Sequence, residues 1–254
     1  MGDDVGTTRR PGRDTQPQPR RIMTTAPTLT PADLDFLRSV DSPTIANAIE
    51  RFKVRPLTDG FVGGQVRCAF PELGPMVGRA LTVTMRNPGD RPASREGFWR
   101  MWEQLEAMAG PTVLMIADHS GAPHRVAYAG EIMTKLARRL GAVGMVTDGG
   151  LRDLAEVRAL GFHYFMRYPV VSHANFEIAT VGEPIELDGQ RIETGDLVHG
   201  DANGIVLIPW EIVPELPEAV EKVRSAEAAD MAFIDGPEFT LGGFKDRRGY
   251  GSGK

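Results

Sequence analysis

The sequence has few of the features that mark secreted, membrane or nucleic-acid-binding proteins. It contains one cysteine, Cys68, which excludes an internal disulfide and favours a reducing compartment. A free cysteine usually behaves as a small buried hydrophobe, so no chemistry is expected from its thiol. No run approaches the roughly 18 consecutive apolar residues of a membrane helix, and the first residues lack the apolar core of a secretory signal. We therefore expect a cytoplasmic protein that does not insert into a membrane.

A basic surface is missing as well. The 254 residues carry a formal net charge of −5. Residues 1–22 contain five arginines and three aspartates, so the rest of the chain carries −7. Nucleic-acid binding depends on a basic footprint that neutralises phosphates, and no nucleic-acid partner is therefore expected. The remaining composition, 41% hydrophobic and 25% charged, is that of a globular domain.

Composition divides the chain into a domain and two tails. Residues 1–28 have almost no apolar side chains, which predicts a disordered tail, because such a segment cannot offset its ordering entropy by burial. Residues 237–254, which include a run rich in Gly, Lys and Arg, are expected to form a flexible C-terminal tail. Residues 29–236 then form a single α/β domain.

Local patterns predict the elements of that domain. Thr30 and Ser42 precede prolines and begin helices. Apolar runs predict strands at 78–85, 113–118 and 143–147, and the second is continuously apolar, as expected when both faces of a sheet are covered. Asp188-Gly189 predicts a hairpin. Further helices are expected at 95–108, 132–140 and 214–228, and short strands at 163–168, 185–187, 190–192 and 205–208. The alternation of strands and helices in the middle of the chain indicates α/β packing.

Residues 148–153, with the sequence Asp-Gly-Gly-Leu-Arg-Asp, are the first candidate site. A glycine-rich turn between a strand and a helix exposes backbone N–H groups, and ligands collect at the carboxyl ends of strands in such folds. Arg152 can bind a carboxylate through two hydrogen bonds, and Asp153 can hold a hard cation such as Mg²⁺. The alternative is structural: Asp153 and Glu156 have capping-box spacing, and Asp148 can brace its own turn.

Gly130 and Glu131 begin another helix and form the second candidate site. The backbone amides at this helix start can receive a carboxylate, and Glu131 can steer a water. The alternative is an ordinary helix N-terminus with an acid in its first turn. Lys135 lies nearby, but its helix position is typical of a solvated surface residue.

These two segments, taken together, resemble the RraA-like family. The resemblance rests on residues 129–131, 144–156 and 195–209. In the last of these a Gly-Asp pair is followed by a later Asp, a Gly and a terminal proline, Pro209. It covers about residues 40–230. The family includes class II 4-hydroxy-4-methyl-2-oxoglutarate and 4-carboxy-4-hydroxy-2-oxoadipate aldolases. It implies a single-domain, layered β/β/α fold assembled as a homotrimer or homohexamer.

The resemblance also implies site roles. The amides of Glu131, Ile132 and Met133, following Gly130, would bind the substrate carboxylate. Arg152 would contact the 2-oxo oxygen and its enolate, and Asp153 would be the protein ligand of Mg²⁺ or Mn²⁺. Glu131 would orient a water that acts as acid or base, although aldolases of the family often have Asp there. The implied reaction cleaves a carbon–carbon bond of a 2-oxo acid to give pyruvate, or decarboxylates oxaloacetate, without a Schiff-base lysine.

Two other functions stay open. The family includes regulators that bind and inhibit a ribonuclease; they would keep the fold without the metal carboxylate, so Asp153 favours an enzyme. An enzyme of the same mechanism could instead act on a sugar-derived 2-oxo acid, with specificity set by 86–110, unless that segment is a plain amphipathic helix. The histidines are secondary: His119, His124 and His173 are candidates for the pocket, whereas His163 and His199 are expected to be structural. Glu156 is either structural or part of the Arg-Asp-x-x-acid pattern.

Overall fold

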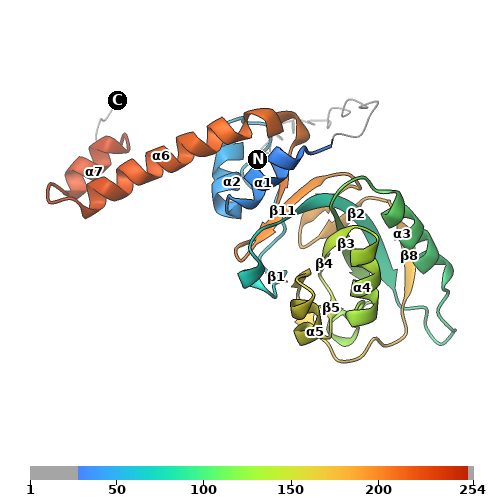
Figure 1. The fold of residues 1–254 in the computed structure, drawn as a ribbon. Helices are drawn as coiled ribbons and strands as arrows, with labels where there is room; N and C mark the ends of the chain where they lie inside the picture. Colours follow the sequence, from blue (N-terminus) through green and yellow to red (C-terminus); the bar gives the residue numbers. More distant parts are fainter. Residues whose placement is uncertain (1–27, 251–254) are drawn as a thin grey trace, which may run out of the picture.

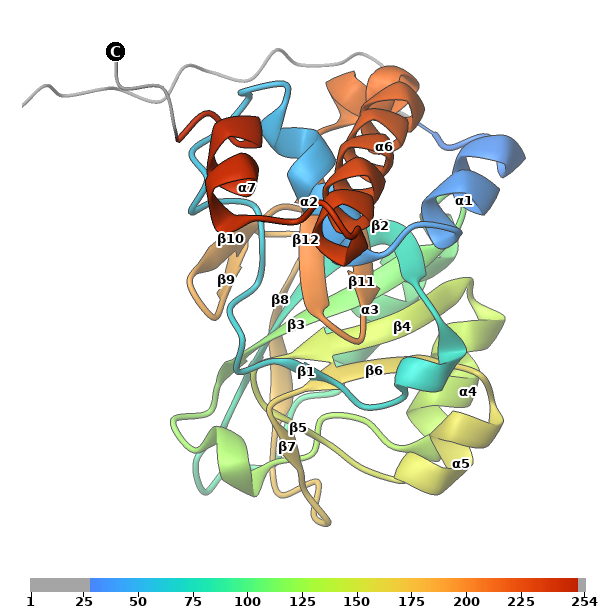
Figure 2. The ribbon, with the colours of Figure 1, turned by 90° about the vertical axis from the view of Figure 1, so that its left-hand side faces the viewer.

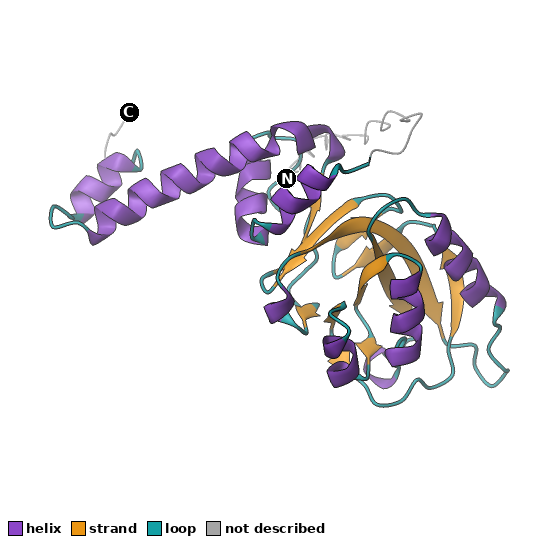
Figure 3. Cartoon of the chain, in the orientation of Figure 1, coloured by secondary structure: helices purple, strands orange, loops and turns teal. Residues whose placement is uncertain are grey.

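The computed structural model describes residues 28–250, so the predicted tail at 1–28 lies almost wholly outside the described residues. The chain forms an α/β single domain of the layered β/β/α kind, as predicted (Figures 1 and 3). The helices are α1 (Pro31–Arg38), α2 (Ser42–Glu50), α3 (Glu96–Ala107), α4 (Glu131–Arg139), α5 (Leu154–Ala159), α6 (Leu216–Asp235) and α7 (Leu241–Arg247), with short 3-10 turns at Pro71–Leu73, Pro123–Arg125 and Trp210–Glu215.

An eight-stranded sheet forms the middle layer. Its strands are β1 (Arg67–Cys68), β2 (Met76–Arg86), β3 (Thr112–His119), β4 (Ala142–Thr147), β6 (His163–Met166), β8 (Glu177–Val181), β11 (Leu197–Asp201) and β12 (Gly204–Ile208). Their order is β1-β6-β4-β3-β2-β11-β12, with β8 also paired to β2. The strands β2, β3, β4 and β6 run parallel, and α3, α4 and α5 connect them.

Two further sheets of two strands each lie outside the main sheet. The strands β9 (Ile185–Leu187) and β10 (Gln190–Ile192) form the predicted hairpin, and both turn residues, Asp188 and Gly189, have positive φ angles of 43° and 86°. The strands β5 (Gly150–Leu151) and β7 (Tyr168–Pro169) pair in parallel beside the candidate site. The predicted glycine-rich turn is confined to Asp148 and Gly149, because Gly150 pairs with Tyr168 in β5.

Apolar side chains cover both faces of the parallel strands. On β3, Leu114 and Ile116 pack in the core below α3 and α4, whereas Val113, Met115 and Ala117 pack on the opposite side with residues of β9 and β10. Figure 2 shows the sheet between α4 and α5 on one side and the β9–β10 hairpin on the other. This explains the unbroken apolar run of β3, since neither face is left to solvent.

The helices near the two ends of the described chain form a third core. Leu37, Ile45 and Ile49 pack against Val206 of β12 and Val220 of α6. The helix start predicted at Thr30 is confirmed, and the structure shows a capping box between Thr30 and Asp33, whereas α2 is capped by Asp41 and begins at Ser42. None of the helices in the described range is both long and apolar enough to cross a bilayer.

The helix α6 is longer than predicted and projects from the body, with α7 folded back at its far end (Figure 1). The helix α7 lies in the segment for which the composition predicts a flexible tail. Thr240 caps it by accepting a hydrogen bond from the N–H of Gly243 at 3.0 Å, and the ring of Phe244 stacks on Phe233 of α6. These two local contacts explain why a glycine-rich segment is helical here.

Candidate functional site

A cavity of about 320 Å³ lies where α4 begins, beyond the carboxyl ends of β3 and β4. Open α/β sheets usually bind ligands at this edge. All six predicted site residues line it, and the sequence had placed them in two segments about 20 residues apart. The lining consists of Arg95, Phe98, Ala127, Tyr128, Ala129, Gly130, Glu131, Ile132, Met133, Arg152, Asp153, His173 and Phe176.

Gly130 allows the two candidate segments to meet. It precedes α4 in an extended conformation, and a Cβ atom there would lie 2.2 Å from Oδ2 of Asp153 and 3.0 Å from Nε of Arg152. Real Cβ atoms do not approach other atoms at 2.2 Å, so the Asp153 carboxylate would have to move. The constraint at 130 thus comes from close approach to the Asp153 side chain rather than from a positive φ angle.

Asp153 does not form the capping box that its spacing with Glu156 suggests. It has a left-handed backbone, with φ 59° and ψ 45°, and its side chain makes no capping hydrogen bond with α5. Its Oδ2 instead accepts a hydrogen bond from the N–H of Glu131 at 2.8 Å. A non-glycine residue at positive φ is uncommon and is often found at functional sites. Glu156 lies in the first turn of α5 and does not line the cavity.

Arg152 lies beside that carboxylate. Its backbone N–H donates to the carbonyl of Ala129 at 3.0 Å, which joins the segment before α5 to the segment before α4. Its Nε lies 3.8 Å from Oδ2 of Asp153, and its Nη1 donates a long hydrogen bond of 3.4 Å to the carbonyl of Val171. These contacts hold the guanidinium in place. The side chain of Arg152 is still 36% exposed, so the guanidinium remains accessible from the cavity.

The start of α4 offers fewer free amides than the sequence suggests. The N–H of Glu131 donates to Asp153, whereas the N–H groups of Ile132 and Met133 make no hydrogen bond with another described residue. The side chain of Glu131 forms an ion pair with Lys135 at 2.5 Å. Lys135 is largely exposed and does not line the cavity, in agreement with the predicted surface position.

A half-buried pair of acidic residues, Asp118 and Asp148, supports the turn beside the site. Asp148 accepts a hydrogen bond from the N–H of Asp118 at 2.8 Å, and the hydroxyl of Tyr128 donates to the carboxylate of Asp118. Burial raises the pKa of Asp148 above its ordinary value and raises that of Tyr128 strongly. Gly149 fits closely here, since a Cβ atom would lie 2.6 Å from the ring of Tyr128. The side chain of Asp148 therefore connects its turn to β3 through the N–H of Asp118.

Sequence reasoning missed several lining residues. Tyr128 had one usable signal: its hydrogen-bond partner Asp118, which does not itself line the cavity, ends the predicted apolar strand at the ligand-binding edge. The sequence contains no signal for Phe98 and Phe176, because an aromatic residue that lines a cavity looks the same in a sequence as one in the core. Their rings lie 5.6 Å apart and form the apolar wall of the cavity.

The arginines of 86–110 have different partners. Arg86 and Arg91 bind the buried carboxylate of Glu177, and the hydrogen bonds from Arg91, Ser94 and Arg86 lower the pKa of Glu177 to about 2. Arg95 instead lines the cavity, with its guanidinium 5.6 Å from the ring centre of Phe98. The segment is thus partly an ordinary helix and partly a wall of the site.

Of the three histidines predicted to be candidates for the pocket, one lines the cavity. His173 lines the cavity, whereas His119 and His124 do not. His199 is buried, with Nδ1 2.9 Å from Oγ of Ser42 and Nε2 near the carbonyls of Leu37 and Val40, so its predicted structural role is confirmed. Cys68 is half-buried, and burial raises the pKa of its thiol, as expected for an unreactive cysteine.

No group of three or more His, Cys, Asp or Glu side chains with the arrangement of a metal site occurs between residues 28 and 250. Mg²⁺, however, often takes one or two carboxylates and keeps its water ligands. Asp153 fits that mode, since its side chain is 38% exposed in the cavity and its Oδ1 accepts no hydrogen bond from the described residues. The donor set therefore suits a largely water-bound hard cation and not a cation that needs several protein ligands.

Comparison with known proteins identifies relatives along most of the chain. The family model "RraA-like: Aldolase/RraA" matches residues 42–207. A protein of Halalkalibacterium halodurans named "Putative 4-hydroxy-4-methyl-2-oxoglutarate aldolase" is 28% identical over 214 residues, which cover 80% of this chain and 91% of that protein. A Marinomonas protein of the same name is 29% identical over 106 residues, 41% of this chain and 65% of that protein.

Solved structures agree with the fold. An uncharacterised protein of Pseudomonas syringae pv. tomato superposes with a TM-score of 0.68 at 21% identity, covering 89% of this chain and 98% of that one. RraAS2 of Streptomyces coelicolor, described as an unusual member of the RNase ES inhibitor RraA family, superposes with a TM-score of 0.63 at 21% identity over 80% of this chain and 98% of that one.

Proposed function

Because the chain belongs to the RraA-like family, we propose that it is a divalent-metal-dependent lyase that cleaves a carbon–carbon bond of a 2-oxo acid. The observation that carries this proposal is the convergence of the Asp153 carboxylate, the Arg152 guanidinium and free amides of α4 in one cavity. The names of the relatives in Halalkalibacterium and Marinomonas support the same class of reaction.

Substrate binding would use the positive end of α4. The free N–H groups of Ile132 and Met133 would receive the carboxylate of the 2-oxo acid, aided by the partial positive charge of the helix N-terminus. The fork of Arg152 would contact the 2-oxo oxygen. The wall formed by Phe98 and Phe176 would exclude water from the remainder of the substrate.

Bond cleavage would leave an enolate that Arg152 stabilises. In the retro-aldol reaction the 4-hydroxyl loses its proton, the C3–C4 bond breaks, and its electron pair passes into the enolate of pyruvate, which then takes a proton at C3. A positioned cation such as a guanidinium stabilises charge that develops in this way. Mg²⁺ or Mn²⁺ held by Asp153 would add Lewis-acid polarisation of the 2-oxo group. Glu131 would orient the water that transfers the proton.

The same arrangement would decarboxylate oxaloacetate. Carbon dioxide then replaces the ketone as the leaving group, and the electron pair of the broken bond again forms the enolate of pyruvate. No lysine is needed for covalent catalysis, and Lys135 pairs with Glu131 and does not itself line the cavity.

The proposed assembly is a homotrimer or homohexamer. Association of copies, though not their number, is supported by the projecting α6–α7 segment, where Met231, Ile234 and Leu241 are exposed apolar residues, and by Ile132, which is 84% exposed at the rim of the cavity. Exposed apolar side chains in a group are typical of protein contacts. Light scattering of the purified chain would measure the mass of the assembly.

The test of the activity is pyruvate release from oxaloacetate and from 4-hydroxy-4-methyl-2-oxoglutarate, measured with Mg²⁺ and with EDTA. The wild type is expected to release pyruvate with Mg²⁺ only, and Asp153→Asn is expected to release none. Asp59→Asn, an exposed acid outside the cavity, is the matched control and should behave as the wild type.

Activity that survives both EDTA and Asp153→Asn would contradict the metal site. A folded protein without activity on either compound would contradict the proposed substrates. Binding to a ribonuclease and turnover of sugar-derived 2-oxo acids would then be measured, since these are the alternatives for the family.

A further inference from the structure

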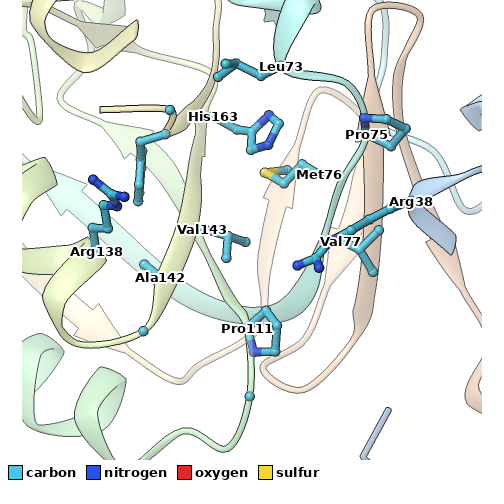
Figure 4. Close-up of a pocket in the computed structure, with 14 residues that line it drawn as sticks. Arg38, Leu73, Pro75, Met76, Val77, Pro111, Arg138, Ala142, Val143 and His163 are labelled. Atoms are coloured by element: carbon cyan, nitrogen blue, oxygen red, sulfur yellow. The ribbon is translucent and has the colours of Figure 1, made fainter. Parts of the chain in front are cut away.

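A second cavity, of about 590 Å³, lies at the opposite edge of the sheet from the candidate active site. It is bordered by the amino ends of β2, β3, β4 and β6, and Figure 4 shows its lining side chains. A volume of this size accommodates a small organic ligand. The residues that line it are Arg38, Leu73, Pro75, Met76, Val77, Gly110, Pro111, Arg138, Gly141, Ala142, Val143, Gly161, Phe162 and His163.

The charged side chains of this cavity are all basic. Arg38 comes from the last turn of α1 and Arg138 from the last turn of α4, and the lining contains no acid. Within residues 28–250, neither guanidinium forms an ion pair or a hydrogen bond, so both remain available to a ligand. Two unpaired cations at one cavity without an acid favour an anionic ligand.

His163 provides an independent indication. Its Nδ1 is buried and has no hydrogen-bond partner among the described residues, although buried polar groups are nearly always satisfied. Burial and the charge of Arg38 lower the pKa of His163 to about 4, so the ring is neutral at neutral pH and can donate one hydrogen bond. Figure 4 shows the imidazole projecting beside Met76 toward the middle of the cavity.

The remaining walls fit an apolar group. Met76, Val77, Pro111 and Val143 surround the space between the two arginines (Figure 4). The helices α3, α4 and α5 end at this edge, and their partial negative charge opposes an anion. Each helix end carries only about half a charge, and Arg38 and Arg138 place full positive charges in the last turns of α1 and α4, on opposite sides of the cavity (Figure 4).

We propose that this cavity binds a small organic anion, with its phosphate or carboxylate group toward Arg38 and Arg138 and its apolar part against Met76 and Val143. His163 would donate a hydrogen bond to the same ligand. The site is separate from the candidate active site, because the two cavities share no lining residue. The inference therefore does not depend on the proposed lyase activity.

The experiment is isothermal titration of the full chain with phenyl phosphate, benzoate and the neutral benzyl alcohol. Phenyl phosphate and benzoate distinguish the two kinds of anionic group, and benzyl alcohol tests the need for charge. At least one anion is expected to bind and benzyl alcohol is not. Arg38→Ala and Arg138→Ala should each weaken binding by roughly tenfold or more, as is usual for the loss of a charged hydrogen bond.

The controls separate this cavity from other anion sites. Arg139→Ala removes the neighbouring arginine of α4, which is exposed and does not line the cavity, and should leave binding unchanged. Arg152→Ala removes the arginine of the candidate active site and should also leave it unchanged. Binding that Arg152→Ala abolishes and Arg138→Ala preserves would place the anion in the active site and overturn the proposal.

Two further outcomes would overturn it. The first is the absence of binding by both anions at millimolar concentration. The second is a smaller assembly in light scattering for Arg38→Ala and Arg138→Ala, with any anion binding unchanged by either substitution. That result would mean that acidic side chains of a second copy cover the cavity.

Discussion

The carboxylate of Asp153 accepts a hydrogen bond from the backbone N–H of Glu131, with 2.8 Å between Oδ2 and N. One contact therefore joins the starts of α4 and α5, which are 22 residues apart in the sequence. It also fixes the orientation of Asp153, whose left-handed backbone turns the side chain away from its own helix. The carboxylate has two tasks as a result: it caps α4, and its other oxygen remains available to a cation.

Gly130→Ala is expected to lower kcat/KM for pyruvate release on the order of 100-fold, because displacement of catalytic groups by about 1 Å has effects of that size. The added Cβ atom would lie 2.2 Å from Oδ2 of Asp153 and force it out of position. Kinetics and circular dichroism melting would be measured together. Gly64→Ala is the control, since its Cβ atom would lie 4.0 Å from the nearest atom. Unchanged kinetics for Gly130→Ala would contradict the role of this close approach.

Asp153→Ala and Asp153→Asn are expected to differ in stability and agree in activity. Alanine leaves the N–H of Glu131 without its acceptor, which costs about 1 kcal/mol for a helix cap. Asparagine keeps an acceptor oxygen and tolerates a left-handed backbone. Denaturant unfolding should therefore rank Asn above Ala, and both should lose Mg²⁺-dependent turnover. An asparagine variant that keeps full turnover would show that the carboxylate only caps α4.

The sequence predicted the elements whose signals are local. The helix start at Thr30, the continuously apolar strand β3 and the Asp188-Gly189 hairpin each depend on a few neighbouring residues, and each is present. The two candidate segments also meet as expected from the resemblance, because both follow parallel strands whose carboxyl ends lie at one edge of the sheet.

Contacts between distant residues could not be predicted in this way. The strand β8 pairs with β2, nearly 100 residues earlier, and Glu177 gave no sign that Arg86 and Arg91 would surround it. The spacing of Asp153 and Glu156 favours a capping box, yet the backbone at Asp153 directs the side chain to another helix. In both cases the partner lies far away in the sequence, where local preferences carry no information.

Arg152→Lys is expected to lower kcat by roughly 100-fold or more, with a smaller change in KM. Lysine keeps the charge but lacks the planar fork that contacts the 2-oxo oxygen, and loss of one such donor typically has an effect of this size. Arg158→Lys is the control on α5, because Arg158 pairs with Glu72 outside the cavity. Steady-state kinetics would be measured for both variants. A loss confined to KM would indicate that Arg152 binds the ground state only.

Glu177→Gln is expected to reduce the fall of the melting temperature as the pH is lowered. Three groups hydrogen-bond to the Glu177 carboxylate and lower its pKa from 4.5 to about 2, so its ionised form stabilises the folded state above about pH 4.5. That stabilisation is lost progressively as the pH falls toward 2. The melting temperature of the wild type should therefore fall over this window more steeply than that of Glu177→Gln, whose melting temperature at pH 7 should be the lower one. Glu183→Gln is the control and should follow the wild type, because Glu183 is an exposed acid that forms no ion pair with another described residue. Equal slopes for the wild type and Glu177→Gln would mean that Arg86 and Arg91 do not hold this carboxylate ionised.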